Sequence, residues 1–92
     1  MIRSFADADT EQVFNHRHSH RDAAFERAAF RTLRQIHRVS RLEELQAPPG
    51  NRLEPLKGDR EGQWSLRINE QWRVCFTWRN GDAYQVEIVH YQ

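Results

Sequence analysis

Cationic side chains and a terminal hydroxyl group mark the part of this chain that is able to do chemistry. The single lysine, Lys57, precedes a turn-like segment, and two strand-like runs after it carry Arg67 and Arg73. Tyr91, near the end of the chain, supplies a hydroxyl that can donate a hydrogen bond or carry a proton. Such cations bind phosphate and stabilise the charge that develops when a phosphodiester is attacked. The residue types therefore predict a phosphate site.

The alternation of apolar and polar side chains predicts how the two runs pair. If Ile68 lies opposite Trp72 across a three-residue loop, Arg67 lies opposite Arg73 on the polar face. Two facing arginines repel each other unless an anion or a carboxylate lies between them. Glu87 is the carboxylate that the pattern offers, so an ion pair on a solvated face remains the alternative to a phosphate site.

The third strand is expected to complete this polar face. Pairing Trp78 with Tyr84 brings Tyr91 near Gln71, diagonal to Arg73. A lysine or tyrosine with an ordinary pKa of about 10 is a poor base at neutral pH. Neighbouring cations would have to lower one of these pKa values for base catalysis.

The first half of the chain reads as helical. Asp7 or Asp9 is expected to cap a short helix to about Asn15, and an amphipathic helix with an arginine-rich outer face follows over residues 21–39. Ser40–Glu43 has capping-box spacing and predicts a further turn through residue 45. The expected inward residues of the long helix are Phe25, Ala29, Leu33 and Ile36.

The second half reads as strands after the turn at Pro48-Pro49-Gly50. The predicted strands cover residues 53–56, 64–68, 72–78 and 83–91, with loops at 58–62 and 69–71.

Three alternating histidines, His16, His18 and His20, raise a metal hypothesis. On a helix, neighbours two positions apart point in nearly opposite directions, and no carboxylate or cysteine completes a ligand set. We therefore expect a solvated interhelix loop, no metal and no cofactor.

Composition predicts one small soluble domain. The 92 residues carry a net charge of +1, with 38% hydrophobic and 29% charged residues. No apolar run approaches the roughly 18 residues that span a bilayer, and no signal-peptide core is apparent. A single cysteine, Cys75, fits a reducing compartment, so we expect a cytoplasmic protein without membrane contact.

One long run carries a resemblance to a known family. The segment NRLEPLKGDREGQWSLRINEQWRVCF, followed by GDAYQVEIVHY, resembles the HigB (plasmid maintenance killer) branch of the RelE/ParE toxin superfamily. The MIRSF start and the PPGNRLE junction match as well. The resemblance implies an α+β fold, in which an N-terminal helical hairpin packs on a small twisted, mostly antiparallel sheet. It also implies a single toxin domain over residues 1–92.

The same resemblance implies the toxin of a type II toxin-antitoxin system. Such toxins are ribosome-dependent endonucleases that cut mRNA by attack of a 2′-hydroxyl on the adjacent phosphate, without a metal. The implied partners are a HigA-type helix-turn-helix antitoxin, the ribosome and mRNA, with operator DNA contacted only through the antitoxin complex. The arginine-rich helix face suits either ribosomal RNA or an acidic antitoxin segment.

Site residues follow from the resemblance position by position. Lys57 and Arg73 match the catalytic cations and Tyr91 matches the near-terminal tyrosine, while phosphate or RNA contacts are expected from Arg60, Arg67 and Glu54. Relatives often carry histidine in place of that glutamate.

The end of the chain departs from the family pattern. His90 replaces an acidic residue and Gln92 a terminal histidine. His90 is then either a substitute acid or base, with an ordinary pKa near 6.5, or a surface histidine. Two other functions stay open: a non-catalytic ParE-like inhibitor that binds gyrase, and a degenerate toxin that acts as an antitoxin-bound co-repressor.

Overall fold

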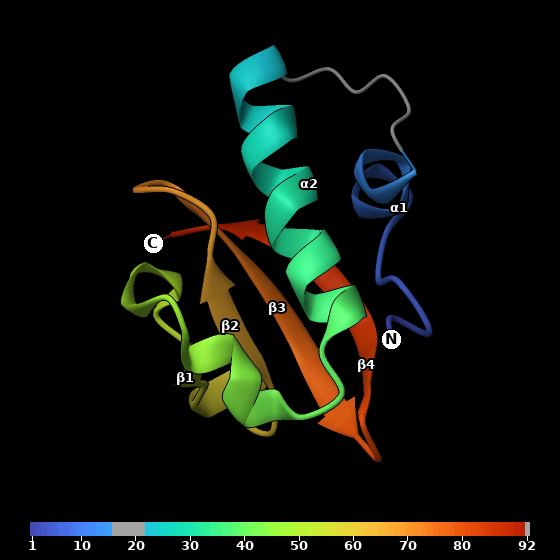
Figure 1. Ribbon diagram of the computed structural model, residues 1–92, viewed down its shortest axis with the longest axis vertical. Helices are drawn as coiled ribbons and strands as arrows, with labels where there is room; N and C mark the ends of the chain where they lie inside the picture. Colours follow the sequence, from blue (N-terminus) through green and yellow to red (C-terminus); the bar gives the residue numbers. More distant parts are fainter. Residues whose placement is uncertain (16–21, 92) are drawn as a thin grey trace.

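The computed structural model, which describes residues 1–15 and 22–91, confirms the α+β fold (Figure 1). The helical elements are α1 (Ala8–Phe14), α2 (Ala23–Arg38) and three short 3-10 turns, η1 (Leu42–Gln46), η2 (Pro49–Asn51) and η3 (Gly58–Arg60). The strands are β1 (Glu54–Pro55), β2 (Trp64–Arg67), β3 (Trp72–Arg79) and β4 (Asp82–His90), which form an antiparallel sheet in that order. Figure 1 shows α2 lying across one face of this sheet, with α1 on the side of β4.

Aspartates begin both α-helices, as predicted for the first of them. The carboxylate of Asp7 accepts a hydrogen bond from Thr10 N–H at 2.7 Å, and that of Asp22 accepts one from Phe25 N–H at 2.8 Å. Each bond satisfies a backbone donor that the first helical turn leaves free. The histidines at positions 16, 18 and 20 lie outside the described residues.

The core fills the space between α2 and the sheet. All four predicted inward residues of α2 are buried against apolar side chains of the sheet, with Leu45 of η1 closing one end. The core residues from the sheet are Leu66, Val74, Phe76, Ala83, Val86 and Ile88. Burial of one side of β2, β3 and β4 leaves the other side of the sheet mainly to polar residues.

The β2–β3 hairpin has the predicted register. Leu66 lies opposite Val74 and Arg67 lies opposite Arg73. The side-chain oxygen of Asn69 accepts hydrogen bonds from Gln71 N–H at 2.8 Å and Trp72 N–H at 2.9 Å, which fixes the three-residue loop.

The predicted pairing of Trp78 with Tyr84 is wrong by one residue. Val74 lies opposite Ile88 as that register requires, but a bulge interrupts the ladder, and Trp78 then lies opposite Ala83. Gln85 takes up the extra residue with a φ of 53°. A bulge of this kind changes which side chains face the core, so Ala83 is buried there in place of Tyr84.

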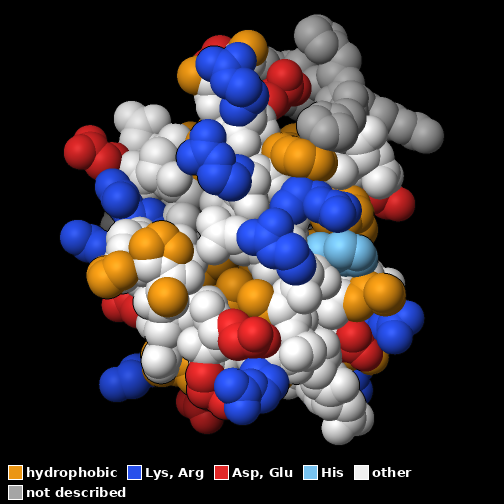
Figure 2. All heavy atoms as spheres, viewed as in Figure 1, with side chains coloured by type: hydrophobic (Ala, Val, Ile, Leu, Met, Phe, Trp, Pro, Cys, Tyr) orange, Lys and Arg blue, Asp and Glu red, His pale blue; other side chains and the backbone are white. Residues whose placement is uncertain are grey.

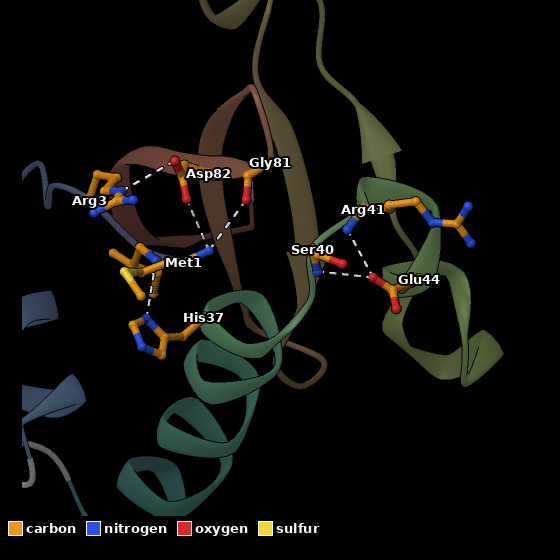
Figure 3. A network of polar contacts seen from close by, with 9 residues as sticks. Met1, Arg3, His37, Ser40, Arg41, Glu44, Gly81 and Asp82 are labelled. Atoms are coloured by element: carbon orange, nitrogen blue, oxygen red, sulfur yellow. Dashed lines mark hydrogen bonds and ion pairs between the residues drawn. The ribbon is translucent and has the colours of Figure 1, made fainter.

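The N-terminal segment docks on β4 in a way that the sequence did not predict (Figure 3). Ile2 and Phe5 form isolated parallel bridges with Ala83 and Val86 of β4. The terminal amino group and Arg3 Nε both contact the Asp82 carboxylate, at 3.3 Å and 3.2 Å. These partners hold the pKa of Asp82 below its ordinary value, although burial opposes them most strongly.

The turn after α2 uses a different carboxylate from the predicted one. Glu44, rather than Glu43, accepts hydrogen bonds from Ser40 N–H at 3.0 Å and Arg41 N–H at 2.8 Å. Because these bonds favour the ionised form, the pKa of Glu44 lies below its ordinary value. Among the described residues, no helix is long and apolar enough to cross a membrane.

Candidate active site

Arg73 lies at the centre of the candidate site, on the sheet face that points away from α2. Its guanidinium lies over the Tyr91 ring, 4.9 Å from the centroid, and it faces Arg67 across the hairpin. Arg73 Nε is buried and makes no hydrogen bond. A buried guanidinium N–H without an acceptor is costly, which makes it a candidate for binding an anion.

Tyr91 is held in place through its backbone. Its N–H donates to Gln71 O at 2.8 Å, which ties the end of β4 to the hairpin loop. The predicted proximity of Tyr91, Gln71 and Arg73 is therefore confirmed.

Glu87 does not neutralise the facing arginines. Its carboxylate accepts from Arg60 NH1 at 3.1 Å, and the same NH1 donates to Gln63 Oε1 at 3.0 Å. Within residues 1–15 and 22–91, no ion pair joins a carboxylate to Arg67 or Arg73. The alternative of a Glu87 ion pair between the arginines is therefore wrong, because Arg60 holds this carboxylate instead.

Two small side chains form the floor of this face. Ser65 and Cys75 lie opposite each other and are almost fully buried, with relative exposures of 1% and 0%. Burial raises the pKa of the Cys75 thiol, against the opposing effect of Arg60 and Arg73. A buried neutral thiol packs as a small apolar group and is not a nucleophile.

A hollow opens beside the facing arginines. Its volume is about 360 Å³, and it is lined by Arg52, Arg67, Glu70 and Tyr91. Arg52 and Glu70 are not among the site residues predicted from the sequence. Arg52 is two residues before Glu54 of β1, and side chains two residues apart along a strand point to the same face. This spacing would have placed Arg52 on the face of Glu54. No periodicity marks Glu70, because it lies in the hairpin loop.

Lys57 lies away from the hollow. It is exposed at the start of η3, next to Leu56, whose N–H donates to Gln63 O at 2.9 Å. Gln63 and Arg67 are four residues apart along one strand, which corresponds to roughly 13 Å. Glu54 is also exposed and lies opposite Ser65. The predicted site residues are therefore not all gathered at the hollow: Arg67 and Tyr91 line it, whereas Lys57 and Glu54 do not.

His90 lies on the other side of the sheet. It is the register partner of Trp72, and its ring meets the Trp72 ring edge-on at a centroid distance of 4.8 Å. Alternation along β4 therefore separates His90 from the face of Arg73. This position argues against direct proton transfer by His90 at the site. Gln92 lies outside the described residues.

The arginines of α2 form a separate cationic surface (Figure 2). Figure 2 shows Lys and Arg side chains following α2 on the face of the molecule in view. Four exposed arginines belong to this helix: Arg27, Arg31, Arg34 and Arg38. One of them, Arg34, also lies over the Phe14 ring at 5.4 Å.

The site combines fixed positive charge with few groups that exchange protons. Guanidinium groups bind an anion and remain charged, whereas a phenol or a carboxylate is able to transfer a proton. Among the described residues, no group of three or more histidine, cysteine or acidic side chains is arranged to hold a metal ion. The arrangement suits stabilisation of a negatively charged phosphoryl group.

Comparison with known proteins gives concordant matches. A family model described as the RelE-like toxin HigB of type II toxin-antitoxin systems matches residues 3–91. Toxin HigB-1 of Vibrio cholerae serotype O1 is 36% identical over 85 residues, which cover 90% of this chain and 90% of that protein. Endoribonuclease HigB of Proteus vulgaris is 51% identical over 41 residues, which cover 45% of this chain and 41% of that protein.

Proposed function

The chain belongs to the HigB family of RelE-like toxins of type II toxin-antitoxin systems, and from this premise we propose that it is a ribosome-dependent endoribonuclease that cuts mRNA. One observation carries the proposal. The Arg73 guanidinium has a buried Nε–H without an acceptor, faces a second arginine and lies against Tyr91. A scissile phosphate satisfies the first two features at once, because its oxygens accept hydrogen bonds and its charge separates the two cations.

The proposed reaction is an internal transesterification. The 2′-hydroxyl oxygen attacks the adjacent phosphorus, so that the O2′–P bond forms while the P–O5′ bond breaks. The 2′-hydroxyl proton passes to a base, and the departing 5′ oxygen receives a proton. The products are a 2′,3′-cyclic phosphate end and a 5′-hydroxyl end, and no metal takes part.

Each group has a distinct part in this reaction. Arg73 and Arg67 bind the phosphate and stabilise the charge that develops on its oxygens in the transition state. Tyr91 donates a proton to the 5′ oxygen, because its ring lies against Arg73 and the residue lines the hollow.

The remaining cations bind the RNA strand away from the reacting phosphate. Lys57 is exposed and its head group is unengaged, which suits contact with a flanking phosphate. Arg60 is held by Glu87 over the sheet face and serves the same strand. Glu54, exposed between these groups and the hollow, contacts the ribose or base side of the RNA.

The partners follow from the family. A type II toxin is controlled by a protein antitoxin, and we propose a HigA-type helix-turn-helix protein in that role, through which the complex reaches operator DNA. Ribosome dependence is part of the same proposal, because a small open hollow gives few contacts to select a cut site without help.

Induction of the protein in growing cells tests the proposal. Wild-type protein should arrest growth and leave mapped cuts in transcripts, whereas Arg73→Ala, Tyr91→Ala and Lys57→Ala should each relieve the arrest while the proteins remain folded. Arg79→Ala is the matched control, because Arg79 lies over Tyr84 at 4.3 Å, outside the site. Intact transcripts together with blocked DNA replication would instead support gyrase inhibition.

A further inference from the structure

The cationic face requires a proton acceptor for the proposed reaction. Arginine cannot accept a proton, since its guanidinium stays charged throughout the accessible pH range. His90, which the sequence offered as a substitute acid or base, lies against Trp72 on the other side of the sheet. The Glu87 carboxylate, on the same face as Arg73, is engaged by Arg60. The 2′-hydroxyl proton needs another destination.

Glu70 is the carboxylate that lines the hollow. It shares this hollow with Arg67, which faces Arg73, and with Tyr91, whose ring lies against Arg73. Glu70 therefore lines the same space as Arg67, one of the two arginines proposed to bind the phosphate. Geometry comes first in identifying a general base, and Glu70 meets that condition.

The loop that carries Glu70 is anchored on both sides. Asn69 accepts two hydrogen bonds from the backbone of Gln71 and Trp72, and Gln71 O accepts one from Tyr91 N–H. These bonds fix the residues before and after Glu70 to strands β3 and β4. A catalytic group gains from such anchoring, because less ordering is needed when the substrate binds.

Among the residues that the structure describes, no ion pair engages the Glu70 carboxylate, although Arg52 and Arg67 line the same hollow. A carboxylate with a purely structural role among these cations would pair with one of them, as Glu87 pairs with Arg60. An unpaired carboxylate keeps its oxygens available to a hydroxyl group.

We propose that Glu70 is the general base of the cleavage reaction, an inference that rests on the endoribonuclease function proposed above. A carboxylate oxygen of Glu70 takes the proton of the 2′-hydroxyl as the O2′–P bond forms. Tyr91 gives its phenolic proton to the 5′ oxygen as the P–O5′ bond breaks. The proton on Glu70 then returns to Tyr91 through solvent, so the protein ends the cycle unchanged.

Glu70→Gln tests this role, because it keeps the shape of the side chain and removes its ability to accept a proton from the hydroxyl. Single-turnover cleavage of mRNA on purified ribosomes should slow by about 100-fold or more. Binding of a ribosome carrying mRNA with a 2′-deoxy nucleotide at the cut site should stay within about threefold. Glu43→Gln is the matched control, since Glu43 is an exposed residue of η1 outside the site, and its rate should equal that of the wild type.

A second substrate separates the base from the acid. Sulfur in place of the bridging 5′ oxygen leaves as a thiolate that needs no proton. With this substrate Tyr91→Phe should recover most of its lost rate, whereas Glu70→Gln should remain as slow as before. This contrast separates proton removal by Glu70 from proton donation by Tyr91. The retained binding of the 2′-deoxy mRNA by Glu70→Gln excludes a general loss of structure as the cause of its slow rate.

Other results would contradict either the role of Glu70 or the endoribonuclease function. A Glu70→Gln rate within about threefold of wild type, a defect relieved by the sulfur substrate, or a loss of binding equal to the loss of rate would each contradict the role of Glu70. Failure of the wild-type protein to cut either substrate would overturn the endoribonuclease function itself.

Discussion

Arg73 is the residue on which the proposed chemistry depends most. Its Nε–H is buried without an acceptor, and its guanidinium is fixed between a second arginine and a tyrosine ring. The planar guanidinium presents several donors in a fixed arrangement, whereas a lysine ammonium acts as a point charge. The role of Arg73 therefore depends on shape as well as on charge.

Arg73→Lys should lower the rate of mRNA cleavage by about 100- to 1,000-fold, the usual effect of losing a donor to the transition state. The free energy of unfolding should change little, because the substitution also removes a buried N–H without an acceptor. Arg79→Lys is the control, since Arg79 has a similar ring contact with Tyr84 outside the site. Single-turnover rates and denaturant unfolding of both variants check this; equal activity of Arg73→Lys and wild type would exclude a geometric role.

Protonation of His37 is expected to make the stability of the folded protein depend on pH. Its Nδ1 accepts a hydrogen bond from Ile2 N–H at 3.1 Å, and its ring packs against Phe14 at a centroid distance of 5.1 Å (Figure 3). Burial, Arg34 and the terminal amino group together lower its pKa from the ordinary 6.5. The folded state therefore binds this proton less readily than the unfolded state.

The stability that neutral His37 contributes should be complete above pH 6.5 and should disappear as the pH falls through the lowered pKa. Below that pKa, the Ile2 N–H loses its acceptor and protonated His37 lies near two other cations. His37→Asn should weaken this pH dependence, because the Asn oxygen accepts the same hydrogen bond without titrating. Denaturant unfolding between pH 8 and pH 5 measures the difference; identical slopes for the two proteins would contradict the account.

Local pattern predicted part of the site correctly. Strand parity placed Arg67 opposite Arg73 and Tyr91 near them, because burial of the tryptophan face fixes which side chains face solvent. The alternation of side chains along a strand does not determine which carboxylate a long side chain pairs with. The ion pair between Arg60 and Glu87 was therefore not predicted. The contribution of Glu70 depends on loop geometry, which has no period in the sequence.

At the scale of elements, the bulge in β4 is the main difference between the predicted and the observed structure. The hairpin was predictable because a short loop and two alternating strands fix its register. The extra residue at Gln85 was not predictable from alternation. Val86 and Ile88, which follow it, keep the expected alternation of buried and exposed side chains, and the pattern shifts only before it. Docking of the N-terminal segment beside this bulge was also missed: Gln85 N–H donates to Ser4 Oγ at 2.9 Å.

Gln85→Gly should raise the free energy of unfolding by about 0.5–1 kcal/mol, because glycine adopts the observed φ of 53° without steric strain. Gln85→Val should lower it by about 1 kcal/mol, since a β-branched side chain is disfavoured in that conformation. Urea midpoints of the two variants provide the comparison. Equal effects of glycine and valine would show that the backbone conformation at this bulge does not limit stability.

At the scale of the whole molecule, the sheet separates two charged surfaces. Arg67 and Tyr91 line a hollow on the sheet face that points away from α2. The arginines of α2 lie on the other face, which Figure 2 shows. The family places an antitoxin among the partners of this protein. The two surfaces allow chemistry and binding to be altered independently by mutation.

The chemical nature of the cut ends tests the central claim most directly. Purified protein is added to ribosomes that carry a defined mRNA, alongside the same mRNA with a 2′-deoxy nucleotide at the mapped cut position. We predict 2′,3′-cyclic phosphate and 5′-hydroxyl ends from the first mRNA, no cut at the substituted position, and no cleavage by Arg73→Ala. Cleavage at the 2′-deoxy position, or ends that carry a 5′-phosphate, would contradict attack by the 2′-hydroxyl and with it the proposed function of this site.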